Sequence, residues 1–387
     1  MSTQLENPAT YQEYFNKEHN LLRTALREFV KKEITPNIYE WEEAGEFPRN
    51  LYNKMADLGY LGIGIPEHMG GAGGDVFSTI VFNEEMMRCG SAGLLASIGS
   101  FGIGLPPIVI HGTPEQIDKY VKPVMTGEKI SALGITEPSG GSDVANLKTT
   151  AVRDGDHYIV NGSKTFITSG VRADQLTCAV RTGDPGAHGI SFLVIEKDTP
   201  GYKVGRALKK MGWWASDTAE IFFDNCRVPA ENLIGKENKG FYMIMENFQM
   251  ERLQLCVMAN MTAQLALEES LKYAKTREAF GQKINGFQVT RHKLVDMATL
   301  VEASREFTYR VAARMNAGVN QLKEVSMAKN FACQSADKVT HEAVQIFGGY
   351  GYMRETMVER LYRDNRILSI GGGTTEIMKE IISGLIL

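Results

Sequence analysis

The sequence predicts a mainly helical α+β protein in which a small antiparallel β region separates two helical regions. Apolar residues recur at helical spacing between residues 1 and about 128. From about 129 to 235, short segments rich in β-branched and aromatic residues alternate with turns, and long helical runs begin at residue 240. We therefore expect domains over 1–128, 129–235 and 236–387, in a chain of 387 residues that is long enough for several cores.

The N-terminal region predicts four helices. Apolar spacing indicates helices over 18–32, 50–58 and 75–88, with a glycine-rich loop between 66 and 74. A fourth helix is expected over 114–125, because Thr113 is a suitable N-cap and Pro114 a suitable first helical residue.

The middle and C-terminal regions differ sharply in pattern. Strands are expected over 157–168, 175–182, 190–197 and 219–228, separated by Gly-, Asn- and Asp-containing turns. Helices are expected over 240–276, 287–317, 321–347 and 373–385. Runs of this length usually pack on one another, as an antiparallel bundle or in an oligomer.

Composition and charge exclude several classes of protein. A net charge of −4 without a basic patch argues against nucleic acid as a partner. The five scattered cysteines form no CxxC pair and are expected to be buried thiols in a reducing compartment. The seven histidines show no ligand spacing, so no metal is expected. A polar N-terminus and the lack of a long apolar stretch predict a cytoplasmic protein that does not enter the membrane.

Glycine is in excess, with 39 in 387 residues. Three glycine-rich motifs are candidate ligand-binding sites. LGITEPSGGSD, residues 133–143, places bare backbone and a hydroxyl where an anion such as a pyrophosphate can approach, although an ordinary Gly/Ser turn has the same composition. QIFGGYGY, residues 345–352, fits either a helix C-cap or close approach of a ligand or a second chain. IGGGTTE, residues 370–376, fits either a flexible linker or a helix N-terminus that holds a carbonyl or a flavin edge.

The fourth candidate is an acid on an apolar helix. Glu246, Glu251 and Arg252 are the only charged residues between 241 and 267. A helix that is apolar on most sides is buried, and burial would raise the pKa of a carboxyl group there, as suits a general base. A structural pair between Glu251 and Arg252, or a contact to another helix, explains the same residues.

Taken together, these motifs resemble the acyl-CoA dehydrogenase family over nearly the whole chain. LGITEPSGGSD is similar to the family's first signature, although Asn146 stands where a small residue is usual. QIFGGYGYMRETMVERLYRD is similar to the second signature, and KTREAFGQKI to the flavin-binding arginine segment. KMGWWASDTAEIFFDNCRVP lies where the family has a corresponding segment, so the motifs also follow in the family's order.

The resemblance implies an N-terminal helical domain, a central β domain, a C-terminal four-helix bundle, a tetramer built as a dimer of dimers, and one FAD per subunit. By position, residues near the flavin and its pyrophosphate are Leu133, Ile135, Thr136, Gly141, Ser142, Phe166, Ile167, Thr168, Thr374 and Glu376. Residues that would reach the FAD of a neighbouring subunit are Arg277, Phe280, Gln288, Gln345, Ile346, Phe347, Gly348 and Gly349. Residues that would meet the acyl-CoA are Ser142, Phe248, Gln249, Arg252, Gly372 and Gly373.

The position of the catalytic base differs from that in many members of the family. Many family members carry it in a Tyr-Glu-Gly-Thr sequence of the C-terminal loop, where this chain has Gly371-Gly372-Gly373-Thr374. The long-chain and isovaleryl branches instead place a glutamate before the helix arginine, as Glu251 precedes Arg252 here. The resemblance therefore implies Glu251 as the catalytic base of a protein similar to those branches.

The implied activity is FAD-dependent α,β-dehydrogenation of an acyl-CoA to its trans-2-enoyl-CoA, in fatty acid or branched-chain catabolism. Long, branched or terpenoid acyl chains are favoured, because the bare loop leaves room beside the α- and β-carbons. Electron-transferring flavoprotein is the implied acceptor. A flavin oxidase or monooxygenase on the same fold, and a non-catalytic FAD-binding scaffold, are the alternatives.

Overall fold

The computed structural model describes Tyr11 and residues 13–387. Contacts between Cα atoms divide the chain into two units. The first, called the helical unit, holds the described residues up to Glu40 together with Gly74–Ala92 and Arg252–Leu387. The second, called the mixed unit, holds Trp41–Gly73 and Gly93–Glu251. The division into three consecutive domains stays a prediction.

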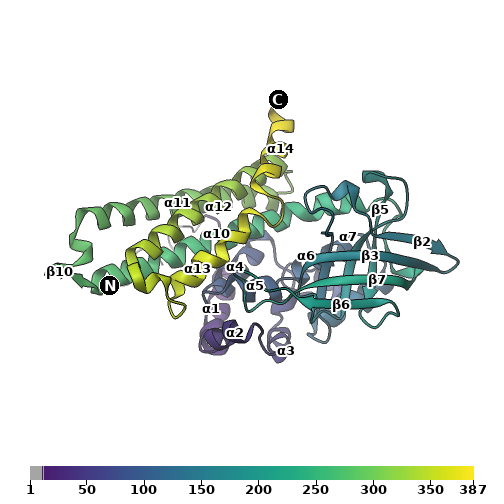
Figure 1. Cartoon of the computed structure of the whole chain (residues 1–387), viewed down its shortest axis with the longest axis horizontal. Coiled ribbons are helices and arrows are strands. Elements are labelled where there is room, and N and C mark those ends of the chain that lie inside the picture. The colour runs from purple at the N-terminus through teal and green to yellow at the C-terminus, as the bar shows by residue number, and fades with distance from the viewer. Residues whose placement is uncertain (1–10, 12) are drawn as a thin grey trace. The chain divides into compact units, whose positions relative to one another are not determined.

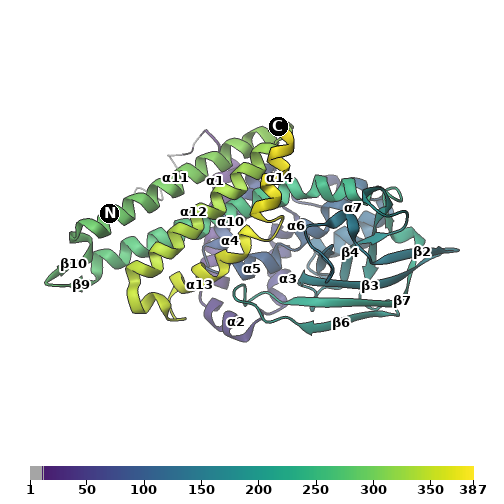
Figure 2. The same ribbon diagram turned by 45° about the horizontal axis from the view of Figure 1, so that its top comes forward.

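Long helices dominate the helical unit, and Figure 2 shows α10, α11 and α12 running side by side. Its helices are α1 (Lys17–Phe29), the π-helix η3 (Val30–Ile34), α4 (Val76–Met87), α10 (Gly240–Thr276) from Arg252 onward, α11 (Gln288–Asn316), α12 (Leu322–Phe347), α13 (Met357–Asn365) and α14 (Thr375–Ile386). Short 3₁₀ turns are η10 (Ile284–Gly286), η11 (Gly348–Tyr352) and η12 (Arg366–Ser369), and β9 (Glu278–Ala279) pairs with β10 (Gln282–Lys283).

The long helices follow the sequence closely. The prediction of helices over 240–276, 287–317, 321–347 and 373–385 is confirmed to within two residues at every end. Thr374 caps α14 by accepting the Ile377 N–H at 3.2 Å, and Gly348, with φ +59°, follows the end of α12. The short helix α13 was not expected.

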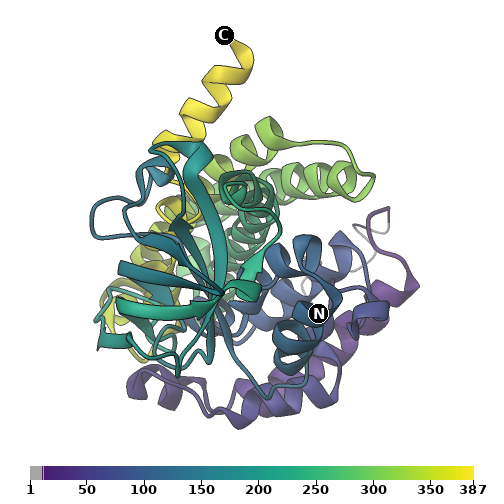
Figure 3. The ribbon, with the colours of Figure 1, turned by 90° about the vertical axis from the view of Figure 1, so that its right-hand side faces the viewer.

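Figure 1 shows β2, β3, β6 and β7 side by side in the mixed unit. The strands are β1 (Ser131–Gly134), β2 (Thr150–Asp154), β3 (His157–Thr168), β4 (Gln175–Arg181), β5 (Ile190–Glu196), β6 (Tyr202–Ala207), β7 (Thr218–Pro229) and β8 (Leu233–Ile234). They form one eight-stranded sheet in the order β6-β7-β3-β2-β4-β5-β8, with β1 beside β4. The strands fan out in Figure 3, as expected for a twisted sheet.

The sheet is antiparallel as predicted except at two places. β1 pairs with β4 in parallel over four residues, and β2 meets β4 in parallel at Thr150 and Arg181. A parallel neighbour needs a long connection, and the β2–β3 hairpin lies between β1 and β4 in the chain. β4 and β5 are buried except at their last residue, which explains why they read as continuous apolar runs.

Short helices complete the mixed unit. They are α3 (Asn50–Asp57), η4 (Tyr60–Gly62), η5 (Glu67–Met69), α5 (Ala92–Ile98), α6 (Phe101–Gly104), α7 (Pro106–His111), α8 (Pro114–Gln116), the π-helix η6 (Ile117–Val121), α9 (Lys122–Met125), η7 (Val144–Asn146), η8 (Ala187–Gly189) and η9 (Ala230–Asn232), while α2 (Ile38–Ala44) spans the division between the units. The expected helix over 114–125 is therefore confirmed as one helical run, in which the π-helical turn η6 lies between α8 and α9. Pro123 lacks an N–H and cannot continue the regular hydrogen-bond ladder there.

All five cysteines are buried and unpaired, as predicted. Among the helices of residues 13–387, none is by itself long and apolar enough to cross a membrane; only the bent pair 92–98 and 101–111 meets that test, by length and composition together.

Candidate functional site

The first glycine-rich motif is anchored to β3 by its backbone. The Ile135 carbonyl accepts from the Lys164 ammonium at 3.2 Å, and the Thr136 carbonyl accepts from the Thr165 N–H at 2.9 Å. Ile135 is 9% exposed, while Leu133 and Thr136 are half-buried. The turn that carries these residues therefore has a fixed orientation relative to the strand that ends at Thr168.

Glu137 lies at the centre of this anchor. Its carboxylate accepts from the Lys164 ammonium at 2.8 Å and from the Lys148 and Thr149 N–H groups at 2.6 and 2.9 Å. Both charged side chains are buried, Lys164 completely. Burial alone would raise the pKa of Glu137, but the charge and hydrogen bonds of its partners lower it below the usual value. The Glu137 carboxylate therefore joins the first glycine-rich motif to β3 and to the loop of Lys148 and Thr149.

The glycines of the motif are exposed. Glu137 and Gly140 exchange backbone hydrogen bonds of 3.2 and 3.0 Å, which closes a tight turn. Gly141 and Ser142, which follow the turn, are both exposed. A Cβ on Gly140 would meet nothing within 4 Å, and one on Gly141 would come within 3.3 Å of the Thr136 methyl group. Bare backbone and a hydroxyl are thus open to a ligand at this turn.

The strand β3 ends in a strained segment. Phe166 has φ +60° and a side chain that is 69% exposed, whereas Ile167 is 2% exposed and Thr168 is half-buried. Ser169 also has φ +60°. A non-glycine residue with positive φ costs free energy and persists only where its surroundings hold it.

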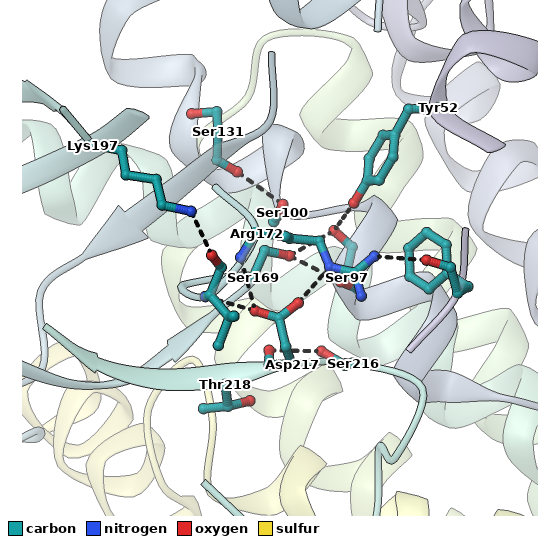
Figure 4. Close-up of polar contacts among 12 residues, drawn as sticks. Tyr52, Ser97, Ser100, Ser131, Ser169, Arg172, Lys197, Ser216, Asp217 and Thr218 are labelled. Atoms are coloured by element: carbon teal, nitrogen blue, oxygen red, sulfur yellow. Dashed lines mark hydrogen bonds and ion pairs between the residues drawn. The ribbon is translucent and has the colours of Figure 1, made fainter. Parts of the chain in front are cut away.

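Figure 4 shows what holds this segment. The Ser169 hydroxyl lies 2.9 Å from the Ser97 hydroxyl and 3.1 Å from the Ser97 carbonyl, and its N–H donates to the Asp217 carbonyl at 2.9 Å. The Asp217 carboxylate accepts from Arg172 Nε at 2.5 Å and from the Val171 N–H at 2.7 Å. Arg172 and Asp217 are both largely buried, so the turn after Phe166 is fixed on two sides.

The helical unit contains an open groove of about 550 Å³ at the end of α12. It is lined by Tyr273, Arg277, Ile284, Ile346, Phe347, Gly348, Gly349, Tyr350 and Met353. The Tyr273 and Phe347 rings stack 4.1 Å apart, and the Arg277 guanidinium lies 5.9 Å from the Tyr350 ring centre. The groove thus offers aromatic walls, bare glycine backbone and one cation.

The other predicted residues of this region lie on the β9–β10 hairpin, at the start of α11 and at the end of α12. Phe280, at the tip between β9 and β10, has φ +51° and is 95% exposed. Gln288, the first residue of α11, and Gln345, in the last turn of α12, are exposed. Sequence reasoning did not single out Tyr273 and Tyr350, although Tyr350 stands within the second signature.

The helix α10 carries the predicted base and the predicted acyl-CoA contacts. Phe248, Glu251 and Arg252 stand at positions i, i+3 and i+4 and so share one face of the helix. Phe248, Gln249 and Glu251 are half-buried, whereas Arg252 is 2% exposed. Arg252 Nε donates to the Gly372 carbonyl at 3.5 Å, which joins the helix arginine to the triple-glycine loop.

The structure thus brings predicted residues together in three places: residues 133–142 with 164–168, Arg277 with 346–349, and Arg252 with Gly372. Thr374 caps α14, and Glu376 lies exposed in its first turn.

Two buried lysines at these places were missed by the sequence reasoning. Lys164 faces the same side of β3 as the buried Tyr158 and Val160. Lys329 lies on the buried stripe of α12 with Val325 and Ala332. In both cases the sequence places a lysine at a position whose neighbours on the same face are apolar. This pattern could have indicated a buried lysine.

These features suit a flavin dinucleotide. A flat ring can rest against an exposed, rigidly held Phe166, and phosphates can approach Gly140, Gly141 and Ser142, where a Cβ-free backbone is open. The groove beside Arg277 combines a cation for phosphate with aromatic walls for an adenine-like ring. Both sites therefore have the chemistry that the resemblance demands.

Comparison with known proteins agrees with these features. The chain matches the N-terminal domain of acyl-CoA dehydrogenases over residues 16–128, the middle domain over 132–226 and the C-terminal domain over 238–387. It is 43% identical over 376 residues to an acyl-CoA dehydrogenase of Bacillus subtilis, covering 97% of this chain and 99% of that protein. A caffeyl-CoA reductase-Etf complex subunit of Acetobacterium woodii (97% and 99% covered) and the mitochondrial long-chain specific acyl-CoA dehydrogenase of Mus musculus (95% and 86% covered) are each 40% identical.

Solved structures show the same fold. The crystal structure of a probable acyl-CoA dehydrogenase from Mycobacterium abscessus is 51% identical, with a TM-score of 0.95 over 97% of this chain and 100% of that one. An acyl-CoA dehydrogenase from Bacillus anthracis in complex with FAD is 33% identical, with a TM-score of 0.90 over 97% and 68%. The chain therefore belongs to the acyl-CoA dehydrogenase family, as an FAD-dependent oxidoreductase that acts on a CH–CH bond.

Proposed function

We propose that this enzyme converts a long, branched or terpenoid acyl-CoA to the trans-2-enoyl-CoA, with Glu251 as the base, as in the long-chain and isovaleryl branches. The observation that carries the proposal is the position of a half-buried Glu251 directly before Arg252, which is itself bonded to a loop that lacks an acidic side chain. A long-chain specific relative and a short-chain specific relative are each 40% identical, so the choice of substrate class rests on the room that the bare loop leaves.

In this mechanism Glu251 removes the α-proton of the thioester as general base. The developing negative charge on the thioester oxygen needs a fixed donor, which the Gly372 N–H supplies. FAD, when bound, accepts the β-hydrogen as a hydride. Phe248, Gln249, Arg252 and Gly373 bind the acyl-CoA beside these groups, and Ser142 contacts it from the turn after Glu137.

FAD is held by two sets of residues. Leu133, Ile135, Thr136, Gly141, Ser142 and residues 166–168 hold the flavin and pyrophosphate, together with Thr374 and Glu376. We assign the groove at Arg277, with Phe280, Gln288 and residues 345–349, to the FAD of a neighbouring subunit. Its open, aromatic and cationic character supports this. The proposed homotetramer rests on the resemblance to the family.

The physiological setting follows from the same reasoning. Electron-transferring flavoprotein is the proposed acceptor, supported by the 40% identical subunit that belongs to a complex with Etf. A catabolic role in the cytoplasm fits a dehydrogenase of this kind. The segment over 96–107, rich in small residues, lies in α5, α6 and the start of α7 and is the proposed wall for the acyl tail.

The test is reduction of the enzyme's FAD by a panel of long, methyl-branched and terpenoid acyl-CoAs under anaerobic conditions. Glu251→Gln keeps the size of the side chain and removes its basicity, and should slow flavin reduction by roughly 10²- to 10⁴-fold. The matched control is Glu246→Gln on the same helix, an exposed acid bonded to His111, which should leave the rate near that of the wild type. Reduction at wild-type speed in the Glu251 variant would assign the base to another residue.

Electron transfer separates the proposal from its alternatives. Reduced enzyme should pass electrons to electron-transferring flavoprotein much faster than to oxygen. Rapid reaction with oxygen would instead identify an oxidase or monooxygenase, and FAD that no acyl-CoA reduces would identify a scaffold.

A further inference from the structure

Two cationic side chains donate hydrogen bonds to three successive carbonyl groups of the triple-glycine loop, residues 371–373. The Lys329 ammonium, on α12, donates to the Gly371 carbonyl at 2.6 Å and also to the Gly373 carbonyl. Arg252 Nε donates to the carbonyl between them, that of Gly372, at 3.5 Å. Lys329 is 1% exposed and Arg252 is 2% exposed, so the donors of all three bonds are buried in the helical unit.

These bonds fix the direction of the N–H groups as well. The peptide bonds of the described residues are all trans. In a trans peptide, the C=O of one residue and the N–H of the next point in opposite directions. Anchoring the Gly371 carbonyl on Lys329 therefore aims the Gly372 N–H away from α12. Gly372 and Gly373 have φ of +61° and +100°, which glycine adopts at little cost.

The Gly372 N–H is also uncommitted. The Gly371 N–H donates to the Ile367 carbonyl at 2.8 Å, whereas within residues 13–387 no protein acceptor takes the Gly372 N–H. A donor that is rigidly held and still available is what stabilisation of a developing oxyanion requires.

We propose that Lys329 is a positioning residue that directs the Gly372 N–H at the thioester oxygen. This inference rests on the proposed function, in which that N–H stabilises the enolate-like oxygen. The lysine charge adds to its geometric effect. Charge-assisted hydrogen bonds are roughly twice as strong as neutral ones. A cation on the carbonyl side of a peptide also polarises the N–H on the other side, which strengthens that donor.

A purely structural lysine would explain burial and satisfied carbonyls, but it makes a different prediction about the bound thioester. If Lys329 only stabilised the fold, its removal would lower the melting temperature and leave the polarisation of the thioester carbonyl unchanged. If it aims and strengthens the donor, its removal weakens that polarisation even in protein that is folded and saturated with ligand.

The experiment measures the infrared stretch of a ¹³C-labelled thioester carbonyl bound to the FAD-loaded Glu251→Gln variant, which turns over slowly enough for the measurement and is called the parent below. The parent should shift the band below its frequency in water. Lys329→Met, which keeps an unbranched side chain as far as the ε position and removes the ammonium group, should move the band back toward the free value. In the enzyme that keeps Glu251, Lys329→Met should lower kcat by about 10- to 100-fold, which is no more than the effect of losing a complete oxyanion donor. KM should change by less than about threefold.

Asn330→Ala is the matched control. Asn330 is the next residue of α12 and donates to the Thr375 carbonyl at 3.2 Å, just beyond the loop. This variant loses a bond to the same segment but keeps the Gly371–Gly372 peptide on Lys329. Its thioester band should match that of the parent.

Lys329→Gln provides a second variant that keeps a neutral donor, and it decides the question if Lys329→Met does not fold. A band that moves toward the free value in either folded variant supports the proposal, and an unchanged band in the folded variants overturns it. If the Glu251→Gln parent does not shift the band and the wild-type enzyme also fails to reduce its FAD with acyl-CoA, the result contradicts the proposed function instead.

Discussion

The Lys164 ammonium lies 2.8 Å from the Glu137 carboxylate, and both side chains are buried beneath the turn that leads to Gly140 and Gly141. The pair joins β3 to the first glycine-rich motif, because Lys164 also holds the Ile135 carbonyl. A buried ion pair stabilises a protein little relative to apolar residues, but it is costly to break on one side. Its position points to a role in shaping the proposed flavin site.

Removing one partner should therefore affect both stability and FAD. Glu137→Gln leaves Lys164 buried without its counter-charge, and should lower the free energy of unfolding by about 3–5 kcal/mol. It should also weaken FAD binding by apoprotein, measured by flavin fluorescence. The control is Asn232→Ala, which removes a buried bond from Tyr120 elsewhere in the mixed unit. An equal loss of FAD affinity in the control would show that stability alone governs cofactor binding.

Stability should fall in acid because of Glu85. This fully buried acid accepts from Arg27 at 2.8 and 2.9 Å and from Arg23 at 3.0 Å. Burial alone would raise the pKa of Glu85, but Arg27, Arg23 and Arg88 lower it below its usual 4.5. The unfolded chain therefore binds a proton first, and stability decreases as the pH falls below about 4.5.

Urea unfolding between pH 6 and 3.5 measures this effect. Glu85→Gln should unfold more easily at pH 6, with a shallower loss of stability below pH 4.5 than the wild type. Parallel pH profiles for the two proteins would contradict the assignment to Glu85.

Gly372 should not tolerate a side chain. Its φ of +61° would cost an alanine about 1–2 kcal/mol. Gly372→Ala should lower both thermal stability and the rate of flavin reduction. Gly371→Ala is the neighbouring control, since Gly371 is not in the left-handed region and a Cβ there meets only the Ile367 carbonyl, at 3.6 Å. Equal effects of the two changes would argue against strain at Gly372.

The cysteines should be unreactive in the folded enzyme. Burial raises the pKa of the Cys178 and Cys333 thiols to about 12 and that of Cys226 to about 11, so very little thiolate forms at pH 8. A chromogenic disulfide reagent should modify the native protein slowly and release five equivalents after unfolding. Fast labelling of native protein would reveal local opening around one of these thiols.

The sequence by itself determined the fold class, the bounds of the long helices, the cap at Thr374 and the strand over 157–168. These are local properties, because helical spacing, strand alternation and capping residues act within a few positions of the chain. The sequence motifs and their order along the chain also carried the family resemblance, which implied FAD and the class of reaction. Both are visible without coordinates.

Only the tertiary structure decided which distant groups meet. Three contacts show this: the parallel pairing of β1 with β4, the ion pair between Glu137 and Lys164, and the bonds from Lys329 to the Gly371 and Gly373 carbonyls. They join residues that are 27 to 44 positions apart. A lysine in a strand or helix reads as a solvated side chain until its neighbours are known. Packing placed both lysines inside, where a charge must have partners, and those partners proved to be the loops that the glycine motifs had marked.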